Sequence, residues 1–106
     1  MSFTWCFVGH THVPGAFVLA PDGRVGSVAL PPGSPVRLRP DDRYIVNVGS
    51  VGQPRDFDSR SSYGIYDSET KEFSLVRVKY DFTITQKKIH DNDLPMFLAE
   101  RLEKGR

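Results

Sequence analysis

Hydrophobic residues occur along this chain mainly in short runs that are typical of β-strands. Phe3–Val8 is aromatic or β-branched almost throughout, a pattern that predicts a strand covered on both faces. Ala16–Ala20 and Arg24–Leu30 flank an Asp-Gly pair, which is a signal for a β-hairpin. A proline-rich loop follows, and Arg43–Val48 then predicts another buried strand. The first half of the chain is therefore expected to be a set of short strands.

The next segments predict a second hairpin. Its strands are expected at Ser62–Asp67 and Glu72–Tyr80, on either side of a polar turn. The large apolar residues of these strands are the candidates for the inward face of the sheet. They are Tyr63, Ile65, Phe73, Leu75 and Val78.

The end of the chain has the pattern of a helix. Thr83, followed three residues later by Gln86, forms a capping-box pattern, and Gly105 supplies a stop. Between them, helical spacing is found in Leu94, Phe97, Leu98 and Leu102. One broken helix or two short helices are expected, so the predicted fold is α+β and rich in strand, with a mixed sheet.

Composition limits what the chain can do. With 106 residues, 39% of them apolar, residues 1–106 are expected to form a single domain or part of one. Lys and Arg total 14 against 13 Asp and Glu, so no field of one sign attracts a nucleic-acid polymer or a membrane. The single cysteine, Cys6, excludes a disulfide framework and indicates the cytoplasm. The opening apolar stretch is too short for a membrane span and resembles no signal peptide.

The first residues with candidate chemistry are Gly9, His10, Thr11 and His12, directly after the first predicted strand. Glycine lets the backbone turn without steric penalty, and the alternate spacing of the two histidines can direct both rings toward one volume. Neutral imidazole is a common ligand for zinc, manganese, iron and nickel. Taken alone, the pair is equally consistent with histidines at a surface turn or at the edge of the core.

A second stretch, Asn47–Asp56, also follows a predicted buried strand, so the two strand ends are expected to meet. Gly49 and Gly52 allow backbone amides to approach an anion, and the planar guanidinium of Arg55 can bind a phosphate. The same residues are also consistent with a tight loop held by a contact of Arg55 with Asp56 or Arg60.

Together the two stretches resemble motifs of the calcineurin-like metallophosphoesterases, in the bacterial branch related to diadenosine tetraphosphatase and Ser/Thr phosphatases. Gly9–Pro14 is similar to the last metal motif of that family. Asn47–Asp56 is similar to its Asn-Pro-Gly-Ser-Val-Gly-Gln-Pro-Arg-Asp segment, with Val48 in place of the proline. Further similar positions are Arg60, Ser62, Tyr63, Tyr80, Asp81 and the Leu94–Leu102 segment, so the resemblance covers nearly the whole chain.

The resemblance implies both a fold and a reaction. It implies that this chain corresponds to the carboxyl-terminal half of a four-layer αββα sandwich. His10 would bind the second and His12 the first of two divalent ions (Mn, Fe, Zn or Ni). The pair of ions activates water to hydrolyse phosphomonoesters, phosphodiesters or nucleotides. The residues implied to support the substrate or the surrounding loops are Gly9, Thr11, Asn47, Gly49, Ser50 and Arg55.

The chain departs from the family in its number of metal ligands. The Asp-x-His, Gly-Asp-x-x-Asp and Gly-Asn-His motifs normally come before the point where this sequence starts. Two histidines cannot hold a metal pair, because a catalytic zinc ordinarily has three protein ligands. The resemblance therefore predicts a truncated phosphoesterase that an amino-terminal half, or a homo-oligomer, completes. The alternative is a non-catalytic remnant or interaction module that self-associates through an exposed sheet edge.

Overall fold

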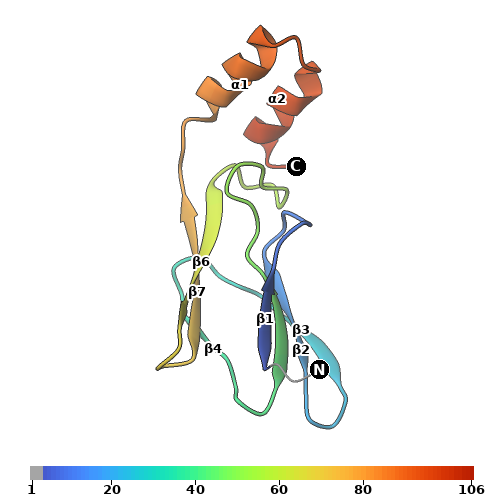
Figure 1. Ribbon diagram of the computed structural model, residues 1–106, viewed down its shortest axis with the longest axis vertical. Helices are drawn as coiled ribbons and strands as arrows, with labels where there is room; N and C mark the ends of the chain where they lie inside the picture. Colours follow the sequence, from blue (N-terminus) through green and yellow to red (C-terminus); the bar gives the residue numbers. More distant parts are fainter. Residues whose placement is uncertain (1–3) are drawn as a thin grey trace.

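The computed structural model describes residues 4–106, in which seven strands precede two helices (Figure 1). The position Phe3, which the sequence pattern assigns to the first strand, lies outside the described residues. The elements are β1 (Trp5–Val8), β2 (Gly15–Leu19), β3 (Val25–Val28), β4 (Val36–Arg37), β5 (Arg43–Asn47), β6 (Ser61–Asp67), β7 (Glu72–Val78), α1 (Phe82–Asp91) and α2 (Met96–Lys104). No helix in this part of the chain is long and apolar enough to cross a membrane.

The strands form two sheets. The first is mixed, with the order β1-β5-β2-β3, in which β1 runs parallel to β5 and the other pairs are antiparallel. The second has the order β4-β7-β6 and is antiparallel. The predicted α+β fold is confirmed, as are both predicted hairpins, β2-β3 and β6-β7.

The core lies between the two sheets and follows the period-two alternation of strands. In β5, Tyr44 and Val46 are buried, with 5% and 0% of their surface exposed, whereas Ile45 between them is 46% exposed. Phe73 and Leu75 of β7 belong to the same buried cluster. The remaining buried members of this cluster are Ala16, Leu30 and Leu38.

The prediction that the first strand is covered on both faces is wrong. β1 is an edge strand of the mixed sheet, and Phe7 and Val8 are 40% and 38% exposed. Its inner side packs on the second sheet, where the rings of Trp5 and Phe7 lie 5.2 and 5.5 Å from the ring of Tyr66, centroid to centroid. β1 and β6 therefore lie on the same flank of the sandwich.

Three of the five side chains predicted to face inward in the second hairpin face outward. Phe73 and Leu75 are buried as expected, but Tyr63, Ile65 and Val78 are 42%, 55% and 44% exposed. The alternation was assigned in the wrong phase on β6, where large apolar residues occupy the outer face.

Two of the residues on the inner face of β6, Ser62 and Gly64, are small because other groups already fill the space beside them. Ser62 is buried and donates a hydrogen bond of 2.9 Å from Oγ to the carbonyl of Val48. A Cβ on Gly64 would lie 2.4 Å from two ring atoms of Phe73, so the ring takes the space that a side chain would need.

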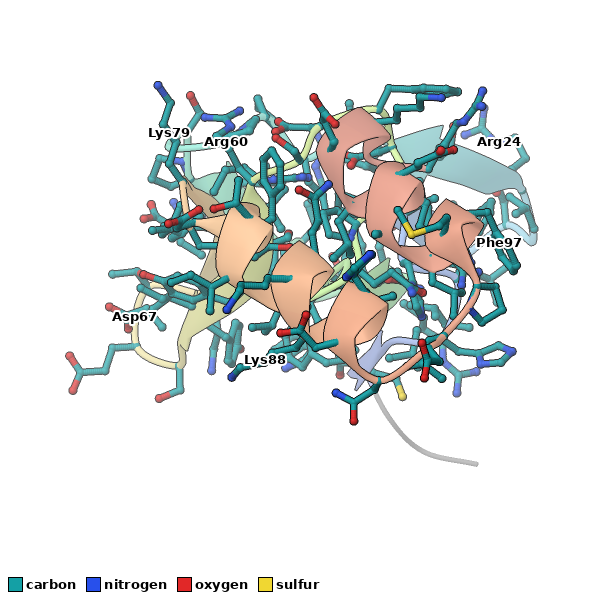
Figure 2. All side chains as sticks on the ribbon, turned by 90° about the horizontal axis from the view of Figure 1, so that it is seen from above. Arg24, Arg60, Asp67, Lys79, Lys88 and Phe97 are labelled. Carbon is teal, nitrogen blue, oxygen red and sulfur yellow. The ribbon has the colours of Figure 1, made fainter. Side chains whose placement is uncertain are left out.

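The two helices lie beyond one end of the sandwich (Figure 1), where Lys88 of α1 and Phe97 of α2 are at the surface (Figure 2). The predicted capping box is wrong, because Asp81 caps α1 by accepting from the Thr83 amide at 3.1 Å. Gln86 instead donates from Nε2 to the carbonyl of Ala99 in α2, at 2.9 Å. Gly105 ends α2 with a φ of 66°, as the sequence indicated.

Candidate metal-binding site

The turn Gly9–His12 follows β1, and the loop that begins at Asn47 follows β5. Because β1 and β5 are parallel and Val8 lies beside Asn47, both segments leave the sheet at the same end. This is the end nearest the helices (Figure 1). The expectation that the two strand ends meet is confirmed, and carboxyl ends of parallel strands are a common location for binding sites.

The His12 ring is oriented by a backbone carbonyl from the second loop. Its Nδ1 lies 2.8 Å from the carbonyl oxygen of Gln53. A carbonyl oxygen only accepts, so Nδ1 carries the proton of the neutral ring and the lone pair is on Nε2. Metal-binding histidines are typically held in this way by their second nitrogen.

The backbone of the histidine turn is in an uncommon conformation. His10 and His12 have φ values of 82° and 63°, in the left-handed region that residues with a Cβ rarely adopt. The His10 side chain is exposed and makes no hydrogen bond or ion pair with other residues of the 4–106 range. Two strained positions within three residues require support from neighbouring groups.

Asn47 provides that support by joining the two segments. Its Nδ2 donates to the carbonyl of Gly9 at 2.9 Å and to Oγ1 of Thr11 at 2.8 Å. Its Oδ1 accepts from the amide of Gly49 at 3.0 Å. One side chain thus holds the Gly9 backbone and the Thr11 hydroxyl, on either side of His10, and fixes the start of the second loop.

The second loop is held against the first through Arg55 and Gln53. The Arg55 amide donates to the carbonyl of His12 at 3.0 Å. The Arg55 guanidinium donates to Oε1 of Gln53 at 2.7 Å, and the Gln53 amide donates to Oγ of Ser50 at 2.9 Å. The tight loop expected from an Arg55 contact with Asp56 is therefore formed with Gln53 instead.

Arg77 anchors the far end of this loop and was missed from the sequence. Its guanidinium, 1% exposed, donates to the two carboxylate oxygens of Asp56 at 2.7 and 3.2 Å. It also donates to the carbonyls of Asp58 and Arg60, each at 2.9 Å. A signal was present, because position 77 shares the inward alternation of positions 73 and 75.

Asp58 and Arg60 form a second charged pair beside Arg77. The Arg60 guanidinium donates to the carboxylate of Asp58 from Nη2 at 2.7 Å and from Nε at 3.0 Å. The hydrogen bond from the Arg60 side chain lowers the pKa of Asp58 to about 2, and the positive charge of Arg77 contributes in the same direction. Asp58 is therefore a carboxylate at neutral pH and is already engaged by two cations.

The donor set fits a part of a metal site and not a complete one. Two imidazoles are available, and the contact of His12 Nδ1 with the Gln53 carbonyl leaves Nε2 of that ring for a metal. In residues 4–106 no group of three or more His, Cys, Asp or Glu side chains is arranged to hold a metal ion. A catalytic metal ordinarily has at least three protein ligands, so a metal bound by these two histidines would need further ligands from outside this part of the chain.

Comparison with known proteins finds similarity to parts of longer chains, while no family model matches. The chain is 43% identical over 100 residues to an uncharacterized protein of Methanocaldococcus jannaschii, covering 94% of this chain and 39% of that protein. It also resembles the crystal structure of a metallophosphoesterase from Sphaerobacter thermophilus, with a TM-score of 0.85 and 34% identity. That match covers 100% of this chain and 43% of the other.

The match to the Sphaerobacter thermophilus structure supports a metallophosphoesterase-like fold for this chain. The two sheets and two terminal helices correspond to part of the matched metallophosphoesterase, because the chain spans 43% of its length. The chain spans 39% of the Methanocaldococcus jannaschii protein. Metallophosphoesterases generally use divalent metals.

Proposed function

We propose that this chain is the carboxyl-terminal half of a calcineurin-like metallophosphoesterase domain and contributes His10 and His12 to a pair of divalent ions. The observation that carries the proposal is the contact of 2.8 Å between His12 Nδ1 and the Gln53 carbonyl. It prepares Nε2 as a ligand in a chain whose fold matches part of a metallophosphoesterase. The reaction is hydrolysis of a phosphomonoester, phosphodiester or nucleotide by water.

The residues of this chain act in the proposed reaction by holding groups in place. A pair of divalent ions, when bound, supplies a clamp for the phosphoryl group and lowers the pKa of the attacking water. Gln53 fixes the ring of His12, and Asn47 holds the Gly9 carbonyl and the Thr11 hydroxyl on either side of His10. The Arg55 amide keeps the two loops at a constant separation. None of these residues forms a covalent bond with the substrate.

The substrate class in this proposal is a small phosphoester. Lys and Arg number 14 against 13 Asp and Glu, which gives no extended positive surface for a nucleic-acid polymer. Cys6 is a free thiol, which is consistent with the proposed cytoplasmic setting. The remaining metal ligands come from an amino-terminal half. A variant of the proposal takes them from another copy of the chain.

The test measures manganese binding and aryl phosphate hydrolysis by the chain completed with an amino-terminal metallophosphoesterase half. We expect His10→Ala and His12→Ala each to lower the rate at least about a hundredfold, because each removes a ligand of the ions that stabilise transition-state charge. His90→Ala is the control, because its ring lies on α1 with its side chain 71% exposed, and this variant should keep full activity. A completed, manganese-loaded protein without hydrolysis would contradict the proposal.

The alternative function is a non-catalytic interaction module that keeps the fold and self-associates. The observation that favours it is the exposed apolar edge at β1, combined with a donor set of two imidazoles. Sedimentation of the chain in the presence of a chelator discriminates between the two, because the module predicts a homo-oligomer that persists without metal, whereas a copy that only completes the metal site dissociates. A monomer at micromolar concentration would exclude it.

A further inference from the structure

β1 lies at a sheet edge without the features that normally protect such an edge. Its four residues, Trp5–Val8, include no charged residue and no proline, and its pairing with β5 is continuous, without a bulge. It is also parallel to its neighbour, and parallel strands normally lie inside sheets that are covered on both faces. Such an edge is suited to accept a further strand.

A groove runs along the same flank, between β1 and β6. It has a volume of about 370 Å³, and its apolar lining includes Phe7, Val48, Val51, Tyr63, Tyr66 and Phe73. Several of these side chains are unusually open to solvent for apolar residues: Phe7 is 40%, Val51 68% and Tyr63 42% exposed. Apolar side chains at the side of the core are therefore open to solvent along this flank. A partner that covers the flank removes this apolar surface from water, which favours binding.

The direction of β1 connects this flank to the candidate site. β1 ends where Gly9–His12 begins, so a strand added in parallel would end beside the two histidines. Residues that follow the added strand can then supply the ligands that this chain lacks. Covering the flank and completing the metal site are thus expected of the same segment.

We propose that the flank formed by β1, β6 and the groove between them is the docking surface for one polypeptide. That polypeptide corresponds to the part of the two matched proteins that this chain does not cover, and it adds a parallel strand to β1. The chain spans 39% and 43% of their lengths, which leaves the larger part of each without a counterpart here. The nature of the partner rests on the proposed function.

A second copy of the chain is a poorer occupant of this flank. In a symmetric dimer, two β1 strands joined edge to edge in one continuous sheet would run antiparallel. The two histidine turns would then lie at opposite ends of the added pair. Such a dimer would cover the edge without completing either site.

The experiment mixes the chain with the segment of the Methanocaldococcus jannaschii protein that it does not match, without metal or substrate. We expect a one-to-one complex in sedimentation velocity, and slower amide hydrogen exchange in Trp5–Val8 and Ser61–Asp67. The positive control pairs the same segment with the matched part of the Methanocaldococcus jannaschii protein itself.

Two matched valine variants locate the surface. Val51→Lys places a charge at the groove, and we expect it to raise the dissociation constant about tenfold or more. Val25→Lys changes a valine of similar exposure, 72% against 68%, on the opposite edge strand of the mixed sheet. We expect it to change the dissociation constant by less than about twofold.

Three outcomes separate docking from catalysis. Absence of a complex, while the two Methanocaldococcus jannaschii segments associate with each other, would overturn the docking proposal. A homodimer of this chain with protected β1 amides would overturn it as well, since the flank would belong to a second copy. A complex that forms as expected but has no manganese-dependent hydrolysis supports docking and rejects the proposed function.

Discussion

Gly64 controls how closely β6 approaches the ring of Phe73. A Cβ at this position would lie 2.4 Å from two atoms of that ring, and Phe73 is itself 1% exposed and stacked on Phe7. Because the ring has no free volume to enter, we expect Gly64→Ala to lower the free energy of unfolding by about 1–3 kcal/mol. Urea unfolding followed by tryptophan fluorescence measures the change.

Gly26→Ala is the matched control for this substitution. Gly26 also lies in a strand, but a Cβ there would meet only Cγ1 of Val18 at an ordinary 3.5 Å. We expect its free energy of unfolding to change by no more than about 0.5 kcal/mol. Equal destabilisation by the two alanines would show that backbone entropy, and not the contact with Phe73, determines the effect.

The location of the candidate residues could be predicted from the sequence, but the geometry around them could not. A histidine pair after an apolar run indicates a turn at the end of a strand. The state of the His12 ring depends on the Gln53 carbonyl, which is 41 residues away in the sequence. Local patterns carry no information on such a contact. The roles assigned to His10, His12 and their supporting residues stay predictions.

At the scale of elements, Arg77 attaches the loop between β5 and β6 to the β7 strand. Its side chain is 1% exposed, and its guanidinium forms an ion pair with Asp56 and donates hydrogen bonds to two loop carbonyls. Arg77→Met removes the cation and leaves partly buried acceptors without partners. We expect a loss of about 2–3 kcal/mol in the free energy of unfolding, below the usual range for a fully buried pair because Asp56 keeps some solvent contact. Hydrogen exchange should also rise in residues 53–58.

The exposed pair of Arg24 and Asp22 is the control for Arg77. The two side chains are 84% and 53% exposed, and the pair closes a hairpin turn at 2.6 Å. Arg24→Met is expected to change the free energy of unfolding by less than about 0.5 kcal/mol, because exposed ion pairs contribute little. If Arg77→Met changed the free energy of unfolding by as little as Arg24→Met, the hydrogen bonds of Arg77 would not be what holds the loop in place.

Element boundaries could be predicted better than the faces of the elements. Asp-Gly and the polar turn near Ser68 located both hairpins, since turn chemistry is local. The phase of β6 was wrong because Ser62 and Gly64 face inward for reasons that involve Val48 and Phe73, which are distant in sequence. The short strand β4 was hidden in a proline-rich segment, where two residues pair with β7.

For the whole molecule, the main feature is the separation between the helices and the sandwich. The described residues extend over 52 × 24 × 21 Å, with the helices at one end (Figure 1). No Cα atom of α1 or α2 lies within 8 Å of a strand Cα in this part of the chain. The sequence predicted both the helical segments and their stop, but amphipathic spacing does not identify the surface against which a helix packs.

Gly105 joins the helices to the loop that Arg77 holds. Its carbonyl accepts from the Phe57 amide at 2.7 Å, and its φ of 66° is in the left-handed region. A Cβ at this position would lie 2.6 Å from the backbone nitrogen of Asp58, which cannot move without breaking the loop. The contact between the helical pair and the rest of the molecule therefore depends on the absence of a side chain here.

Gly105→Ala is expected to loosen the helices while the sandwich stays folded. Amide exchange in α1 and α2 should rise at least about tenfold, and exchange in β5 should change much less, because local opening and global unfolding are separate processes. Gly23→Ala is the control, since Gly23 also has a positive φ, 89°, but no atom within 4 Å of the added Cβ. It shares the backbone strain without the clash. Uniform loss of protection in Gly105→Ala would instead mean that helices and sheets unfold as one cooperative unit.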